Sequence, residues 1–183
     1  MTTEEIEKQL ADLKAQVEGL KRTQQEDKLS MIVFSGDLDK AQAAFIIATG
    51  AVAMGLEVVM YFTTWGAPLL RDKNKTVPGK DMMGTLFGHM LPKGAGAAKL
   101  SKMNMGGIGT SMMKSLMKKK NVASLEEMIK MAAELGVKIF IAELSMDLMG
   151  LKREEMIDYP GVEYVGAATF LEHAIRSKIT LFL

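Results

Sequence analysis

Two acids and a serine follow a short apolar run in the stretch KIFIAELSMDLMG, residues 138–150. The run predicts a buried strand, and the residues after it predict a helix start. Ligands of parallel α/β sheets bind at such junctions. The candidate pocket residues here are Ala142, Glu143, Ser145, Met146 and Asp147. A structural role stays open, in which Ser145 caps a helix beginning at Met146 and Asp147 favours the positive end of that helix.

Two further junctions supply polar side chains upstream. SGDLD follows the apolar run MIVFS, and TTWG follows LEVVMYF. They add Ser35, Gly36, Asp37, Thr63, Thr64 and the only tryptophan, Trp65, to the candidate pocket. The structural alternative is that Ser35 or Asp37 caps the following helix, which stabilises it by about 1 kcal/mol, and that Trp65 only walls the core.

A methionine-rich and glycine-rich segment completes the candidate pocket with Met103, Asn104 and Met105. NMGGIGT is glycine-rich like a phosphate loop, but it does not directly follow a strand and lacks the Walker order of lysine and hydroxyl. Two thioethers suit Cu(I), yet the chain has no cysteine and this segment no adjacent histidine. We expect neither a metal nor a cofactor.

The composition excludes several kinds of chemistry. Without cysteine, the chain has no disulfide, no thiolate metal site and no cysteine nucleophile. The two histidines, His89 and His173, belong to no recognisable nucleophile elbow, so we assign no catalytic residue. A formal charge of +1 gives no sign of a nucleic-acid partner. The polar N-terminus does not look like a signal peptide, so we expect a cytoplasmic location.

These junctions need a sheet to position them. From residue 30 onward, strand patterns alternate with helix patterns, which predicts an α/β domain over residues 30–183 with an open, doubly wound parallel sheet of about five strands. Ser124 with Glu127 forms a capping box for one helix, and Gly136 ends it. A short helix is expected around residues 146–157. A helical hairpin, rich in methionine and glycine, is expected as an insertion at about residues 73–121, covering the ligand end of the sheet.

The first 29 residues differ from the rest. Apolar residues recur at alternating spacings of four and three, which predicts a heptad helix with the seam Ile6, Leu10, Leu13, Val17 and Leu20. Residues 23–29 are expected as its linker. The seam indicates self-association as a coiled coil, and packing back on the domain stays open as the alternative.

The order of the motifs SKMNM, SMDLMG and GAATFL resembles the DsrE/DsrF-like family, in particular its peroxiredoxin-like, methionine-rich branch, over about residues 30–183. The resemblance implies a small oligomeric α/β sulfur carrier of a sulfur relay. In that branch a cysteine accepts sulfane sulfur two residues before the MSMD-type motif, and this position corresponds to Ala142. A thiol there would be activated by the adjacent helix N-terminus, whereas a methyl group cannot carry sulfur.

Two explanations follow from the missing thiol. The chain is expected to act as a non-catalytic subunit or binding protein, as a homo-oligomer or beside cysteine-bearing relatives or a sulfurtransferase. The alternative is noncovalent binding of a small ligand, a sulfur oxyanion or a nucleotide, in the inherited pocket. Peripheral membrane contact through the methionine-rich insertion and its KSLMKKK tail is a weaker alternative.

Overall fold

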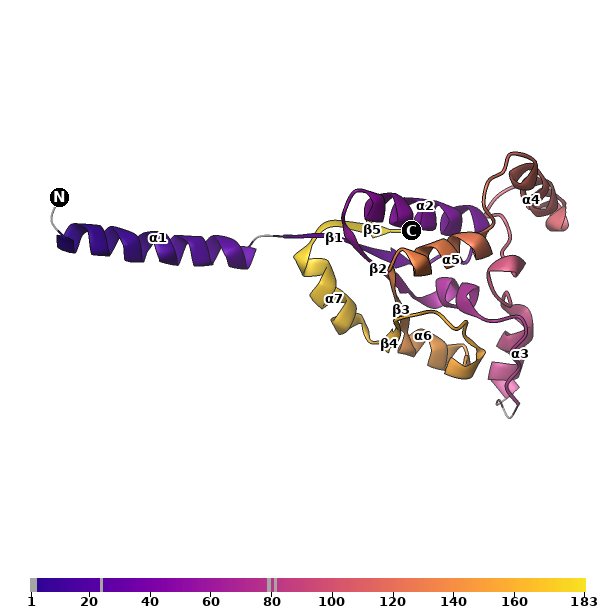
Figure 1. Ribbon diagram of the computed structural model, residues 1–183. Coiled ribbons are helices and arrows are strands. Elements are labelled where there is room, and N and C mark those ends of the chain that lie inside the picture. The colour runs from indigo at the N-terminus through magenta and orange to yellow at the C-terminus, as the bar shows by residue number, and fades with distance from the viewer. Residues whose placement is uncertain (1–2, 24, 79, 81) are drawn as a thin grey trace.

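The computed structural model describes residues 3–23, 25–78, 80 and 82–183. Its helices and strands are α1 Thr3–Thr23, β1 Glu26–Val33, α2 Leu38–Ala53, β2 Glu57–Phe62, η1 Thr64–Leu70, α3 Met82–Met90, η2 Ala95–Ala97, η3 Met105–Gly107, α4 Ile108–Lys119, α5 Leu125–Glu134, β3 Lys138–Ala142, α6 Glu143–Leu148, η4 Arg153–Glu155, β4 Val162–Val165, α7 Ala167–Arg176 and β5 Ser177–Phe182, where η marks a 3₁₀-helix. Figure 1 shows this arrangement along the chain.

The five strands form one sheet in the order β4-β3-β2-β1-β5. Every neighbouring pair is parallel. Successive strands therefore move along the sheet in one direction from β1 to β4, and the chain then crosses back to place β5 beside β1. This confirms the expected five-stranded parallel α/β fold.

The direction of the crossovers decides which face each helix covers. Right-handed connections put α2 and α5 on one face and send α7, the return connection, to the other, as Figure 1 shows. Alternate residues of β1 follow this division, because Leu29 and Met31 pack into the large core under α2 and α5, whereas Ile32 packs into a smaller cluster under α7. Phe170 is the buried anchor of that smaller cluster.

The helix boundaries follow the local signals where those signals are strong. Ser124 accepts a hydrogen bond from the backbone N–H of Glu127, and the Glu127 carboxylate accepts from the Ser124 backbone N–H, so the capping box forms. The hydrogen bonds that Glu127 accepts from Ser124 also hold the pKa of Glu127 below its ordinary value. Gly136 follows α5 with a positive φ of 75°, as a helix-terminating glycine does.

Three details of the expected organisation are wrong. The first strand already begins at Glu26, so the linker expected over residues 23–29 is shorter. The short helix expected at 146–157 is two pieces, because α6 ends at Leu148 and η4 starts at Arg153 after a turn at Gly150, whose φ is 59°. The insertion at about 73–121 is not a helical hairpin, because α3 and α4 lie apart and do not pack side by side (Figure 1).

A buried ion-pair cluster, made of Arg71, Lys80 and Glu155, ties this insertion to the domain. Arg71 Nη2 lies 3.1 Å from Glu155 Oε2, and Lys80 pairs with the other oxygen of the same carboxylate. Burial by itself raises the pKa of Glu155, but the hydrogen bond from Lys80 and the charge of Arg71 hold the pKa below its ordinary value. The carboxylate therefore joins the segment before α3 to η4.

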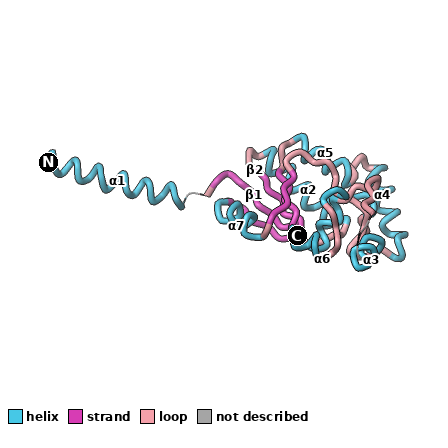
Figure 2. Tube along the Cα trace, turned by 90° about the horizontal axis from the view of Figure 1, so that it is seen from below, coloured by secondary structure: helices cyan, strands magenta, loops and turns pink. Residues whose placement is uncertain are grey.

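The helix α1 extends away from the α/β domain in both views (Figures 1 and 2). Its described seam side chains, Ile6, Leu10, Leu13 and Val17, are 45–58% exposed, and the side chain of Leu20 lies outside the described residues. The structure therefore does not pack the seam back on the domain. No helix in the described part of the chain is long and apolar enough to cross a bilayer.

Candidate functional site

Ala142 lies where β3 meets α6. It is the last residue of the strand and the N-cap residue of the helix, and it is only 2% exposed. Its methyl group belongs to the small cluster on the α7 face, where the rings of Tyr61 and Phe170 stack with centroids 5.0 Å apart. The position is therefore covered by apolar side chains at the carboxyl end of the sheet.

Ser145 joins this junction to the end of the neighbouring strand. Its Oγ accepts a hydrogen bond of 2.9 Å from the Thr64 backbone N–H and lies 2.9 Å from Thr63 Oγ1. Thr64 has a positive φ of 46°, so this bond stabilises a conformation that non-glycine residues rarely adopt. The expected cap at Ser145 is wrong, because the helix begins at Glu143 and the serine is its third residue.

The other residues of this junction point to different surroundings. Met146 is buried in the large core, whereas Asp147 is exposed and lies beyond the first turn of α6. Glu143 forms an exposed ion pair with Arg153, whose guanidinium lies 4.7 Å from the centre of the Tyr164 ring. Both acids are therefore at the surface, outside the apolar surroundings of Ala142.

The β1–α2 junction is held by its own side chains. Ser35 Oγ donates to Asp37 Oδ2 at 2.8 Å and accepts from the Asp37 backbone N–H at 3.1 Å. Asp37 occupies the N-cap position of α2, but its side chain makes no capping hydrogen bond and pairs with Lys40 at 2.9 Å. The expected capping role of these two side chains is therefore not seen.

Gly36 brings the first two junctions into direct contact. A Cβ at Gly36 would lie 2.5 Å from the backbone oxygen of Trp65, closer than real Cβ atoms approach. Trp65 is 49% exposed, so it is not part of the hydrophobic core, as the structural alternative had it. The structure therefore brings the three strand-end junctions together, through Gly36 with Trp65 and through Ser145 with Thr63 and Thr64.

Met103, Asn104 and Met105 lie in a separate surface segment. The methionines are 79% and 68% exposed, and both have positive φ values, of 57° and 46°. Asn104 Oδ1 accepts a 2.7 Å hydrogen bond from Thr110 Oγ1, at the start of α4. Among the described residues, no hydrogen bond joins Met103, Asn104 or Met105 themselves to the three junctions. Ser101, two residues earlier, donates through its backbone N–H and its hydroxyl to the Asp39 carboxylate of the first junction, at 2.8 and 2.6 Å. The segment is therefore anchored beside that junction, while its two methionines are exposed to solvent.

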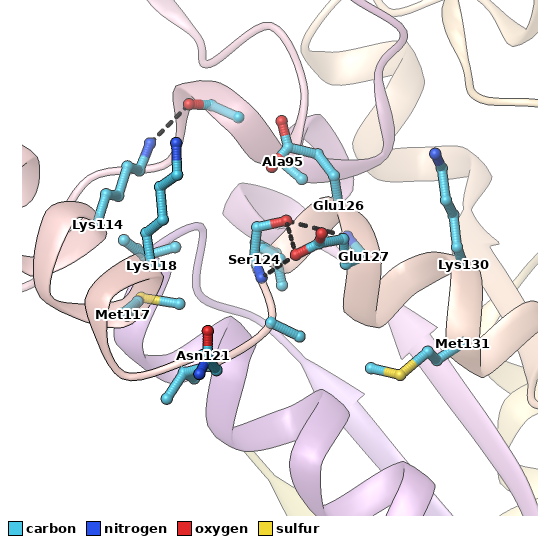
Figure 3. A pocket seen from close by; sticks show the side chains of 15 residues that line it. Ala95, Lys114, Met117, Lys118, Asn121, Ser124, Glu126, Glu127, Lys130 and Met131 are labelled. Atoms are coloured by element: carbon cyan, nitrogen blue, oxygen red, sulfur yellow. Dashed lines mark hydrogen bonds between the residues drawn. The ribbon is translucent and has the colours of Figure 1, made fainter.

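Two cavities lie elsewhere, in places that sequence reasoning missed. One of about 910 Å³ opens between α4 and α5, and Figure 3 shows three lysines, Lys114, Lys118 and Lys130, around it with Glu126 and Glu127. A second, of about 260 Å³, is lined by charged residues that include Arg71. None of the fourteen predicted pocket residues lines either cavity. The sequence contains Lys114 and Lys118 within the insertion, but it gives no local signal that they lie beside α5.

Within the described residues, no group of three His, Cys, Asp or Glu side chains is placed to hold a metal ion. His173 packs edge-on against Phe140 with ring centres 5.1 Å apart, and the side chain of His89 lies outside the described residues.

Comparisons with known proteins agree with this fold. The DsrE/DsrF/DrsH-like family matches residues 25–182. The chain is 42% identical over 161 residues to the uncharacterized protein YrkE of Bacillus subtilis, covering 88% of this chain and 99% of that protein. It is 38% identical over 160 residues to the sulfur carrier protein DsrE2 of Allochromatium vinosum, covering 87% of this chain and 99% of that protein.

A solved structure shares the fold at low sequence identity. The ychN protein of E. coli superposes with a TM-score of 0.50 at 9% identity, over 85% of this chain and 98% of that one. This likeness concerns the fold alone. The family match and the two sequence relatives, which span the α/β domain, lead to one conclusion: the chain belongs to the DsrE/DsrF/DrsH-like family.

Proposed function

We propose that this chain serves a sulfur relay as a noncovalent subunit or binding protein and does not itself carry sulfur. The observation that carries the proposal is the buried Ala142 at the β3–α6 junction of a chain without cysteine. A persulfide forms when a thiolate attacks a sulfane sulfur and the donor leaves as a thiol. A methyl group has no lone pair for this attack. Ser145 does not replace the thiol, because an alcohol has neither its acidity nor its redox chemistry.

Sulfur loading followed by intact mass measurement tests this proposal. The wild-type chain, incubated with glutathione persulfide, is expected to keep its mass, and a stable added-sulfur mass would overturn the noncovalent role. Ala142→Cys is expected to gain one sulfur atom, with glutathione released. Ser111→Cys, at an exposed position on α4, is the control for ordinary thiol reactivity. A folded Ala142→Cys variant that stays unloaded while Ser111→Cys reacts would contradict an inherited sulfur site.

The second part of the proposal is self-association through α1. Most of the stability of an amphipathic helix in a protein comes from packing of its apolar face, and the exposed seam of the 21-residue helix α1 supports burial against another copy. Leu13→Lys is expected to lower the mass of the assembly in solution, because it places a charge in the seam. Ala15→Lys, on the side of the helix away from the seam, is the matched control. If the assemblies of both variants had equal masses, α1 would not contribute to self-association.

A second candidate function is the binding of a small anion in the cavity between α4 and α5. Lys118 and Lys130 carry positive charge into it, and Lys114 donates a 2.7 Å hydrogen bond to the Gly96 carbonyl at its rim. Titration calorimetry with thiosulfate tests this function. Heat of binding that disappears in Lys118→Ala would favour it over the noncovalent subunit role, and absence of heat with the wild-type chain would reject it for this anion.

A further inference from the structure

The charges beside the seam of α1 carry information about how two copies pair. With Ile6 and Leu13 at the d positions and Leu10 and Val17 at the a positions of the heptad, Glu7 and Lys14 occupy the e positions. All six are within the described part of α1, and all six side chains are exposed. The residues at the g positions, Gln9 and Gln16, carry no charge.

We infer that α1 pairs with α1 of a second copy in the antiparallel orientation. In an antiparallel pair, an a position faces a d position across the seam, so Leu10 lies opposite Leu13 of the second copy. The same register places Ile6 opposite Val17 of the second copy. By the two-fold symmetry each of these layers forms twice, and every described seam residue has an apolar partner.

The charge pattern selects this orientation. In the antiparallel register, e positions face e positions, and Glu7 meets Lys14 of the second copy between two apolar layers, twice by symmetry. On the opposite flank Gln9 meets Gln16 of the second copy, an uncharged amide pair. In a parallel pair, e positions face g positions, so Lys14 meets Gln9 and no ion pair forms. Opposite charges are therefore matched only when the helices run in opposite directions.

The antiparallel pair has a consequence for the whole assembly. The helix has 21 residues, so it is about 30 Å long. Each α/β domain begins at Glu26, directly after its own helix. Two domains joined by an antiparallel pair therefore lie at opposite ends of the coil, and their candidate sites stay separate.

The inference rests on the self-association proposed above, and cysteine cross-linking separates the two. The natural chain has no thiol, so each introduced cysteine reports only its own position. An oxidised mixture of full-length Ile6→Cys and Val17→Cys chains is expected to form the mixed disulfide dimer. Ile6→Cys alone is expected to stay uncross-linked, because its two copies lie eleven residues apart along the coil, about 16 Å. Cross-linking of Ile6→Cys with itself would overturn the antiparallel orientation and leave self-association intact.

Charge exchange gives an independent reading by sedimentation equilibrium. Glu7→Lys turns two attractive contacts into two repulsive ones, so the dissociation constant is expected to rise about tenfold. Adding Lys14→Glu to the same chain is expected to restore dimerisation. A parallel pair would be insensitive to both changes, and such insensitivity would refute the antiparallel pairing. A wild-type chain that stays monomeric would refute both the orientation and the self-association.

Discussion

Replacing Ser145 with alanine tests whether the β3–α6 junction depends on the bond that holds it to the end of β2. The hydroxyl bridges two groups 81 and 82 residues away in the chain, the Thr64 backbone N–H and Thr63 Oγ1. Alanine removes both contacts without adding bulk. It leaves a part-buried N–H without its partner at Thr64, where the backbone is already in the left-handed region.

The expected loss follows from the number of contacts. Two hydrogen bonds contribute about 1 kcal/mol each, and an unsatisfied, part-buried N–H adds to the loss, so the free energy of unfolding should fall by about 2–3 kcal/mol. In a chain of this length, this corresponds to a decrease of about 5–10 °C in Tm.

Thermal and urea unfolding followed by circular dichroism measure this loss. Ser111→Ala, on the exposed side of α4, is the control and should change the free energy of unfolding by less than about 0.5 kcal/mol. A double-mutant cycle with Thr63→Val should show a coupling free energy of about 1 kcal/mol, because both side chains share one contact. The reasoning is refuted if Ser145→Ala melts within about 1 °C of the wild type, since water would then replace the bridge without cost.

Two further changes test the buried ion-pair cluster at Glu155 and the contact between η1 and β1 at Gly66. Glu155→Gln should lower the free energy of unfolding by about 3 kcal/mol in urea, because it leaves buried cations without their carboxylate, whereas exposed Glu154→Gln should not. The pKa of Glu155 is lowered in the fold, so its contribution is present above the unfolded pKa and is lost as pH falls through the folded pKa. The variant should therefore lose less stability on acidification than the wild type, and an equal loss would contradict this. Gly66→Ala should destabilise the fold, because its Cβ would lie 2.2 Å from the Val33 backbone oxygen, whereas Gly50→Ala, which meets nothing within 4 Å in α2, should raise the melting temperature. A melting temperature for Gly66→Ala equal to that of Gly50→Ala would contradict the close approach of η1 to β1.

The features that were predicted correctly depend on residues close together in the chain. Ser124 and Glu127 form the capping box, three residues apart, as expected. The strand and helix order also followed, because apolar spacing records which face of each element is buried. Parallel pairing then follows, because a helix between two strands returns the chain to the same end of the sheet.

The candidate site was predicted only in part. Three strand ends do converge, and Gly36 with Trp65 shows how closely. The roles within them were wrong, because Ser145 bonds across the sheet to Thr64 and does not cap its own helix. Met103 was assigned to the same pocket, but its side chain is exposed at the surface, although Ser101 anchors its segment beside the first junction. The residues of a long insertion carry few local signals that indicate which part of the domain the insertion contacts.

The sequence alone determined the alternating α/β order, the heptad seam and the absence of any thiol, since these are properties of local pattern and composition. Only the tertiary structure decided that Ala142 is enclosed by aromatic side chains of α7 and β2, and that a lysine-lined cavity opens between α4 and α5. Only the tertiary structure decided, too, that the seam of α1 is exposed and not packed on the domain. Contacts between distant segments depend on how whole elements pack, and each residue's own neighbours in the chain do not specify that packing.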